Sequence, residues 1–155
     1  MGILVAGPAQ EGLEFFPYRE DQLALIAPYG HPLAPRRSVR FADTLEFDYV
    51  GLHATSNTNA QLIHAASGLQ RSLRFPVRVK SYDALCLMVE AGLGLGILPR
   101  TLANSYGRGL RIKVLTLNEP WANRALAICV RSYASLPIPA QLFVDHLRAI
   151  KPAAK

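Results

Sequence analysis

The residues best suited to binding a small molecule form one short segment, HATSNTN, from His53 to Asn59. Thr55 through Asn59 each carry a hydroxyl or an amide close to the backbone, where they can exchange hydrogen bonds with a ligand. A helix is expected to begin near Ser56 or Asn57, because both residue types are good helix caps. The unpaired N–H groups of a first helical turn bind anions. The segment therefore predicts an anion-binding loop, and an ordinary capping loop with His53 as a simple polar neighbour is the alternative.

No residue pattern typical of catalysis is found. The sequence lacks a nucleophile elbow, a zinc-protease helix, a paired-cysteine motif and two carboxylates at acid–base spacing. The four histidines lie far apart and have no companion nucleophile: His31, His53, His64 and His146. We therefore predict no enzyme activity, no catalytic residue, no metal and no cofactor. A small transferase or deaminase on the same fold is the enzymatic alternative.

A glycine-rich segment, AGLGLGILP at residues 91–99, separates a predicted helix from a predicted strand. Ser81 is expected to cap the helix over residues 82–91, and Gly92 to end it in a left-handed conformation. Glycines that bind phosphate follow a strand and open a helix, which is the opposite order. We therefore expect no nucleotide site here. Gly94 and Gly96 are instead expected to let another backbone approach closely.

The elements that would position the polar segment alternate between strand and helix. Two consecutive strand–helix–strand units are predicted: strand 48–52, helix 56–67, strand 73–80, helix 82–91 and strand 94–98. Pro76 places the second strand at an edge, so the spatial order of the three strands is 2-1-3. Ligands bind beyond the carboxyl ends of such strands, where the order reverses. This predicts a site at His53 to Asn59, with Ser81 and Pro99 as neighbours.

The remaining segments are predicted to form short elements of a mixed α/β fold. His31 is expected to form a turn hydrogen bond, and Pro17 marks an edge or a bend in an extended segment over residues 13–18. The amino terminus is expected to be a buried strand. Further predicted elements are strand 22–28, helical turns 41–45, a helix from Pro99 to Tyr106, and strands 110–115 and 124–131. Two helices have predicted buried faces: Leu62, Ile63 and Ala66 in the first, and Leu142, Phe143, His146, Leu147 and Ile150 in a closing helix over 137–150.

Composition limits the class of protein further. The 155 residues are half hydrophobic, with a mean hydropathy of +0.15, enough for one domain or two small lobes. No apolar run is long enough to span a membrane, and the first residues lack the features of a secretory signal, so we expect a cytoplasmic protein.

The net charge of +6 comes from scattered Lys and Arg without interleaved aromatic residues, which favours a solvated basic face over a nucleic-acid interface. Cys86 and Cys129 are expected to be buried thiols.

Five stretches together resemble the effector-binding domain of LysR-type transcriptional regulators. Their order and spacing cover nearly the whole chain: EFFPYREDQLALIAPYGHPLA (14–34), FADTLEFDYVGL (41–52), RVKSYDALCLMVEAGLGLGILP (78–99), WANRALAICVRS (121–132) and PAQLFVDHL (139–147). The resemblance implies a type 2 periplasmic-binding-protein-like α/β fold, with a Rossmann-like lobe II that has a parallel-rich sheet, plus a partial lobe I. Lobe II would be residues 23–130, and lobe I would be residues 1–22 and 131–155.

The same resemblance implies a function. In this family a small metabolite, usually an anion, binds in the cleft between the lobes. Lobe II would contribute His53, Thr55, Ser56, Asn57 and Thr58, and lobe I would contribute Ala6, Gly7 and Pro8. The expected partners are such an effector and further copies of the chain in a dimer or tetramer, with no membrane.

The chain departs from the family pattern at its amino end. The winged helix-turn-helix and the first half of lobe I have no counterpart in it, so promoter DNA would be bound only through that absent domain. The remnants of lobe I are expected to expose apolar surface, which predicts pairing with another chain, a swap, or an altered position for helix 137–150. A solute-binding protein of the same fold, serving a transporter, is the alternative function.

Overall fold

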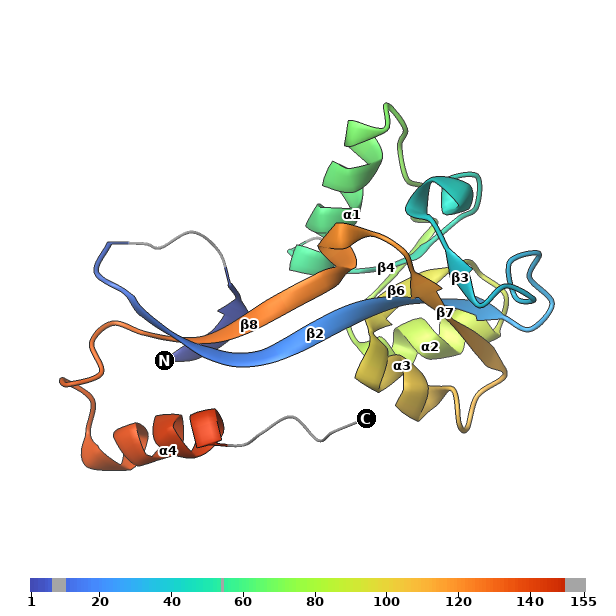
Figure 1. The fold of residues 1–155 in the computed structure, drawn as a ribbon. Coiled ribbons are helices and arrows are strands. Elements are labelled where there is room, and N and C mark those ends of the chain that lie inside the picture. Colours follow the sequence, from blue (N-terminus) through green and yellow to red (C-terminus); the bar gives the residue numbers. More distant parts are fainter. Residues whose placement is uncertain (7–10, 54, 150–155) are drawn as a thin grey trace. The chain divides into compact units, whose positions relative to one another are not determined.

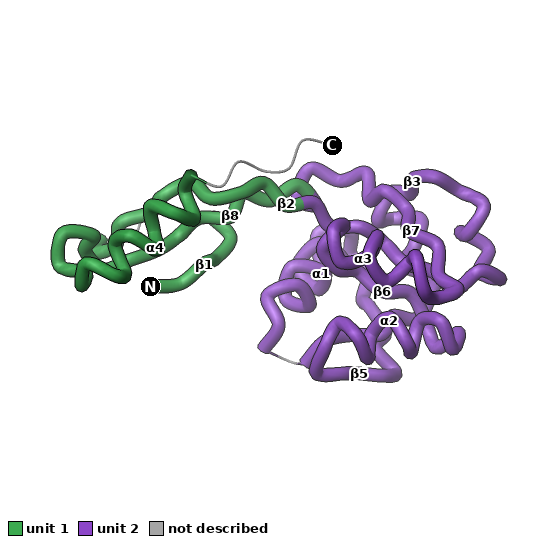
Figure 2. The backbone as a smooth tube through the Cα atoms, turned by 90° about the horizontal axis from the view of Figure 1, so that it is seen from below, with its two compact units in different colours: residues 1–21, 123–155 green, residues 22–122 purple. Residues whose placement is uncertain are grey.

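The computed structural model describes residues 1–6, 11–53 and 55–149, and the chain forms two compact units (Figure 2). Unit 1 comprises Met1–Asp21 and Asn123–Lys155, and unit 2 comprises Gln22–Ala122. Strand β2 (Glu14–Pro28) contributes its first half to unit 1 and its second half to unit 2. Strand β8 (Asn123–Val130) lies in unit 1, whereas the lobe boundaries predicted from the sequence placed these residues in lobe II.

A mixed sheet forms the centre of unit 2. Strand β2 pairs antiparallel with β6 (Gly96–Pro99) on one side and with β7 (Ile112–Leu117) on the other, and β3 (Ser38–Val39) pairs parallel with β7. Successive side chains of a strand point to opposite faces, and β2 is apolar on both. Leu23 and Leu25 pack on the face that helix α1 (Asn57–Gly68) covers, and Ile26 packs on the face that α2 (Tyr82–Glu90) and α3 (Arg100–Tyr106) cover (Figure 1).

The predicted strand–helix–strand units are present in unit 2. Strand β4 (Val50–Leu52) pairs parallel with β5 (Val77–Val79), and on its other side Tyr49 forms a parallel bridge with Leu95. The three segments therefore run in one direction in the predicted order 2-1-3. Beyond Leu95 the third segment leaves β4 and becomes β6, because β2 offers it a longer antiparallel partner. All three strands are shorter than predicted.

The sequence predicted two separate extended segments where the structure has the single strand β2, and this prediction was wrong. The strand continues from Glu14 to Pro28 through Pro17. Residues of the first half pair with β8, and the order β1-β8-β2 leaves them at the edge of the sheet in unit 1. Proline lacks an N–H group and is tolerated at an edge, as predicted for Pro17.

Most helix boundaries follow the predicted caps. The Ser81 hydroxyl accepts a hydrogen bond from the Ala84 N–H at 3.2 Å, and Gly92 after helix α2 has a φ of +83°. Helix α3 begins directly after Pro99 and is followed by Gly107. Helix α1 ends at Gly68, but the left-handed residue beyond it is Gln70, with a φ of +55°.

The two glycines before β6 have different roles. A Cβ atom on Gly94 would lie 2.7 Å from the carbonyl oxygen of Asp48, and its φ of +149° also favours glycine. The expected close backbone approach is therefore confirmed at Gly94. At Gly96 the prediction of a close backbone was wrong. A Cβ atom there would meet side-chain atoms instead, with Leu85 Cδ2 at 2.6 Å.

Short 3-10 turns complete unit 2. Turn η1 (Phe41–Thr44) confirms the helical segment predicted there, and the Glu119 carboxylate accepts a 2.7 Å hydrogen bond from the Phe41 N–H beside η2 (Pro120–Ala122). The Thr44 and Tyr49 hydroxyls share a 2.6 Å hydrogen bond in the core.

Unit 1 is a small sheet covered by one helix. Strand β1 (Gly2–Val5) pairs antiparallel with β8, and helix α4 (Ile138–Ala149) packs Val144 and Leu147 against Ile128 and Val130. Asp21 and Arg124 form an ion pair whose side chains are only about a tenth exposed. None of the helices in the described residues is long and apolar enough to cross a membrane.

The predicted burial was wrong for β1 and for parts of two helices. Every residue of β1 is exposed, because β1 is an edge strand with β8 as its partner. In α1, Leu62 and Ala66 are buried as predicted, but Ile63 is 49% exposed. In α4 the residues Leu142, Phe143 and His146 are exposed, whereas Leu147 is buried as predicted and Ile150 lies outside the described residues.

Candidate anion-binding site

The polar segment after β4 is folded into a tight turn that leads into helix α1. The Ser56 N–H donates to the His53 carbonyl at 3.0 Å, and the Ala60 N–H donates to the Ser56 carbonyl at 3.0 Å. Ser56 has an extended backbone and is the N-cap of the helix. The helix therefore starts where the sequence predicted, at the carboxyl end of β4.

The side chain of Asn59 holds this turn against the end of β4 through two hydrogen bonds. Its Oδ1 accepts a hydrogen bond from the Leu52 N–H at 3.2 Å, and its Nδ2 donates to the Leu52 carbonyl at 2.6 Å. One amide thus satisfies both backbone groups of the last residue of β4, at a point where both are buried. The sequence treated Asn59 only as one member of the polar segment. The sequence signal available for this role is an asparagine in the predicted first helical turn, seven residues after the end of a short apolar strand.

The Ser56 side chain does not cap the helix. It accepts no hydrogen bond from the first-turn N–H groups, although serine at this position normally does so. The N–H groups of Asn57, Thr58 and Asn59 have no acceptor inside the helix, as in any first turn. Ser56, Thr58 and Asn59 are buried, and only one other polar or charged residue in the described chain is, Thr44. A first turn with buried hydroxyl-bearing residues and no side-chain cap is unlike an ordinary solvated cap.

The exposed part of the segment carries a second polar pair. His53 Nδ1 and Thr55 Oγ1 lie 2.8 Å apart and share a hydrogen bond, and both side chains are exposed. Asn57 is exposed too. The structure therefore brings together the five predicted residues of lobe II, namely His53, Thr55, Ser56, Asn57 and Thr58, around one helix end.

The predicted residues of lobe I are only partly described. Ala6 is exposed, and its N–H donates to the Ala125 carbonyl at 2.7 Å, which extends the pairing of β1 with β8 in unit 1. Gly7 and Pro8 lie outside the described residues.

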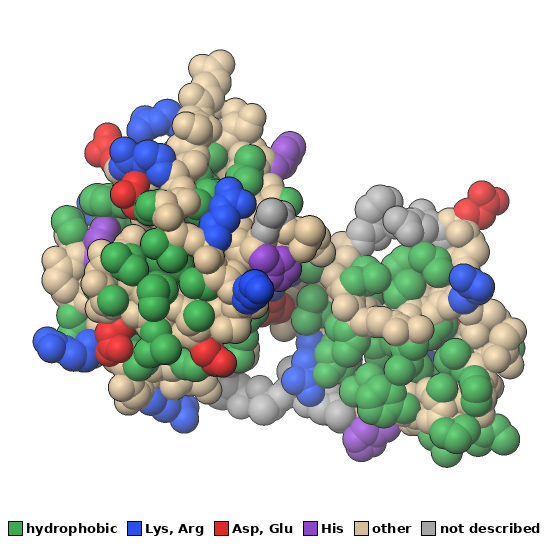
Figure 3. Space-filling model, turned by 180° about the vertical axis from the view of Figure 1, so that it is seen from behind, with side chains coloured by type: hydrophobic (Ala, Val, Ile, Leu, Met, Phe, Trp, Pro, Cys, Tyr) green, Lys and Arg blue, Asp and Glu red, His purple; other side chains and the backbone are tan. Residues whose placement is uncertain are grey.

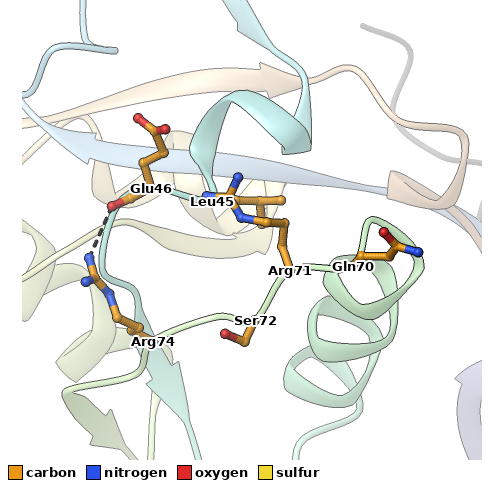
Figure 4. A pocket seen from close by; sticks show the side chains of 6 residues that line it. All are labelled: Leu45, Glu46, Gln70, Arg71, Ser72 and Arg74. Atoms are coloured by element: carbon orange, nitrogen blue, oxygen red, sulfur yellow. Dashed lines mark hydrogen bonds between the residues drawn. The ribbon is translucent and has the colours of Figure 1, made fainter.

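Two surface hollows of unit 2 lie away from these residues. One, of about 460 Å³, is bordered by the ends of η1 and α1, where Arg74 donates to the Glu46 carbonyl at 3.1 Å (Figure 4). The other, of about 340 Å³, lies between α2 and α3 and is lined by residues such as Leu87 and Tyr106. Neither of them includes a residue that the sequence predicted to bind a ligand.

Two side chains of types common in catalysis, His31 and Cys86, lie away from the polar segment in the sequence and are partly or fully buried. His31 Nδ1 accepts a hydrogen bond from the Leu33 N–H at 3.1 Å, as predicted, and partial burial lowers the pKa of its imidazole. Burial, with a smaller contribution from Asp83, raises the pKa of the Cys86 thiol to about 11. In the described part of the chain, no three His, Cys, Asp or Glu side chains are grouped closely enough to hold a metal ion.

Positive charge is spread widely over the surface. On the face shown in Figure 3, Lys and Arg side chains are dispersed among other types and form no continuous patch. Several are held locally, as in the 2.7 Å ion pair between Arg74 and Asp48. This agrees with the solvated basic surface predicted from the sequence.

The fold defines the class of protein. Its two α/β units, with the chain passing twice between them, correspond to the type 2 periplasmic-binding-protein-like fold. The regulatory domain of CcmR from Synechocystis PCC6803, solved with 2-PG, aligns with a TM-score of 0.82 at 20% identity, covering 95% of this chain and 71% of that one. The effector binding domain of QuiR, solved with shikimate, aligns with a TM-score of 0.74 at 22% identity, covering 94% and 68%.

The family follows from the sequence comparison. The model of the LysR substrate binding domain matches residues 1–151, and the chain belongs to this family. A probable RuBisCO transcriptional regulator of Emiliania huxleyi is 31% identical over 137 residues, which are 83% of this chain and 43% of that protein. The regulator CysL of Bacillus subtilis (strain 168) is 27% identical over 129 residues, which are 82% and 42%.

These relatives are transcriptional regulators, which confirms the family resemblance and does not favour a solute-binding protein of a transporter. The chain spans less than half the length of each of them.

Proposed function

We propose that this chain is the ligand-sensing domain of a LysR-type transcriptional regulator and that it binds a small anionic effector without catalysis. The residues proposed to bind the effector are His53, Thr55, Ser56, Asn57 and Thr58 of unit 2, with Ala6, Gly7 and Pro8 as the contribution of lobe I. The whole regulator would act in the cytoplasm as a dimer or tetramer. It would bind promoter DNA through a winged helix-turn-helix in another part of the protein.

One observation supports this proposal: Ser56 is a buried residue at the N-cap of α1, but its side chain accepts no hydrogen bond from the first-turn N–H groups. These N–H groups are therefore free to donate to another acceptor. An anion at this point would accept hydrogen bonds from the Ser56 hydroxyl and from the first-turn N–H groups. It would also lie at the positive end of the α1 dipole.

Similar structures support an anionic ligand and a link to DNA. QuiR was solved with shikimate, which is a carboxylate, and full-length CbnR, at a TM-score of 0.75 and 18% identity, was solved with its target DNA. An effector changes the activity of such a regulator only if it binds two arrangements of the protein with different affinity. We expect the same requirement to hold for the effector of this chain.

Calorimetric titration of the chain with small acids tests the proposal. The panel would contain shikimate, benzoate, 3-phosphoglycerate and inorganic sulfate. We expect at least one to bind, and Ser56→Ala to weaken that binding about tenfold or more, the value of one hydrogen bond to a charged group. Ser72→Ala, in the hollow near η1, is the matched control and should leave the affinity unchanged. Equal affinities of wild type and Ser56→Ala would place the ligand elsewhere.

A further inference from the structure

Arg100 is a half-buried cation with incomplete pairing. It is the first residue of α3 and follows Pro99, the last residue of β6. Its Nη2 donates to the Thr116 hydroxyl at 2.9 Å, whereas its Nε is buried and has no hydrogen-bond partner among the described residues. No carboxylate of the described chain forms an ion pair with it. Arg100 is thus held in place without a counter-ion.

Arg124 in unit 1 provides the comparison. Its Nε is also buried and unpaired, but its guanidinium forms the ion pair with Asp21. Burying a positive charge is costly unless a negative group compensates it. Of these two similar arginines, only Arg124 has such a group inside the described chain. The difference indicates that the partner of Arg100 comes from outside it.

The strand direction places Arg100 on the same side of unit 2 as the polar segment. Tyr49 and Leu95 are aligned in a parallel bridge, and His53 and Pro99 each follow four residues later. Beyond Leu95 the second segment pairs with β2, but it continues in the direction of β4, so α1 and α3 both begin beyond the carboxyl ends of these strands.

The donors left on the guanidinium suit an oxyanion. Nη1 makes no hydrogen bond to the described residues and is not among the fully buried unpaired atoms, so its N–H groups remain as donors. Nη2 is fixed by Thr116, which holds the plane of the guanidinium in one orientation. A fixed, planar arginine binds carboxylate or phosphate oxygens more strongly than a mobile lysine does.

We infer that Arg100 is the charge partner of the effector and binds its carboxylate or phosphate group, while the amino end of α1 binds a second acceptor of the same molecule. This inference rests on the proposed function and makes it more specific. It defines the ligand class as acids that carry at least one further polar group, such as hydroxy acids or phosphorylated acids. Arg100 becomes a residue that selects acids over their neutral analogues.

The test compares an acid with its methyl ester in variants of Arg100. For the acid of the panel above that binds wild type best, we expect Arg100→Gln to weaken binding about tenfold or more. Arg100→Lys should have a smaller effect. Arg108→Gln removes the same charge from an exposed residue nearby and should change the affinity less than about twofold. The preference of wild type for the acid over the ester should disappear in Arg100→Gln.

A second measurement does not depend on the folding of a variant. The Nε–H signal of Arg100 in the NMR spectrum of wild type, assigned by its loss in Arg100→Lys, should shift when the acid is added and not when the ester is added. Normal acid binding by Arg100→Gln, combined with weakened binding by Ser56→Ala, would overturn this inference and leave the proposed function standing. If no acid binds wild type, both are wrong.

Discussion

At the residue scale, Asn59 determines the geometry of the turn. Its amide pairs with both backbone groups of Leu52 and thereby holds the last residue of β4 against the first turn of α1. The two hydroxyl-bearing residues Ser56 and Thr58 are positioned by the same contact, because they lie in the turn that it closes. The candidate site therefore depends on a residue of the predicted segment that supports the turn through its own amide.

Replacing Asn59 by Ala should lower the free energy of unfolding by about 2–4 kcal/mol, because two buried backbone groups lose their partners. Urea denaturation followed by circular dichroism measures this. Asn57→Ala, in the same helical turn but exposed, should change stability by less than about 0.5 kcal/mol. Similar losses in the two variants would show that the Asn59 amide does not hold the turn.

The buried Cys86 thiol makes stability depend on pH in the alkaline range. Its pKa is raised from 9.0 to about 11, so the unfolded chain ionises before the folded protein does. Below about pH 9 the thiol is neutral in both states and does not change the free energy of unfolding. Between about pH 9 and 11 the free energy of unfolding should fall by up to about 2 kcal/mol. Cys86→Ala lacks this titration.

Urea unfolding of both proteins between about pH 8 and 11 measures the difference. Burial also raises the pKa of Tyr49, but this residue makes the same contribution to the pH dependence of wild type and of Cys86→Ala, so it cancels in the comparison. Parallel stability curves for wild type and Cys86→Ala would contradict the expected shift.

At the scale of elements, the connection from α2 to β6 depends on glycine at two positions for different reasons. Gly92 needs a left-handed backbone but has open space around it, whereas Gly94 also touches the Asp48 carbonyl of the neighbouring segment. The first requirement is local and is typical of a helix end. The second exists only because Tyr49 and Leu95 are paired in the folded sheet.

Substitution by Ala should separate these two contributions. Gly92→Ala should lower the free energy of unfolding by about 1 kcal/mol, the usual value for a left-handed position. Gly94→Ala should lower it by more than about 2 kcal/mol, because the backbone of Asp48 must move as well. The measurement is denaturation at equilibrium, and an effect at Gly94 no larger than that at Gly92 would argue against the close approach.

At the scale of the whole molecule, unit 1 leaves much of its apolar surface uncovered. Six large apolar residues of β1 and α4 are more than a third exposed: Ile3, Leu4, Val5, Ile138, Leu142 and Phe143. This matches the exposure that the sequence predicted for the remnants of lobe I. Apolar surface of this kind favours association, because contact removes it from water.

The chain should therefore self-associate as its concentration rises, which analytical ultracentrifugation detects. Leu142→Gln combined with Phe143→Gln should shift the chain toward the monomer, because it removes apolar side chains from the exposed face of α4. Leu69→Gln changes another exposed leucine, in unit 2, and is the control that should have little effect. A monomer at all concentrations would contradict this expectation.

Local patterns in the sequence were enough to determine most elements and the family. Ser81, Gly92 and Pro99 act through neighbours within a few residues, so their capping roles could be predicted from residue type and spacing. The polar segment was likewise located by its place after an apolar strand. The five stretches that resemble LysR-type regulators identified the family, which the match over residues 1–151 confirmed.

Tertiary structure decided which faces are buried and which polar groups are paired. The periodicity of α4 does not reveal that only β8 and its neighbours cover it, so Leu142 and Phe143 were wrongly expected in the core. The pairing of Asn59 with Leu52, and the lack of a hydrogen-bond partner for Arg100 Nε among the described residues, are properties of three-dimensional neighbours. Burial and pairing depend on where the folded chain places each side chain, and residue type and spacing alone do not determine that, even for residues as close in sequence as Leu52 and Asn59.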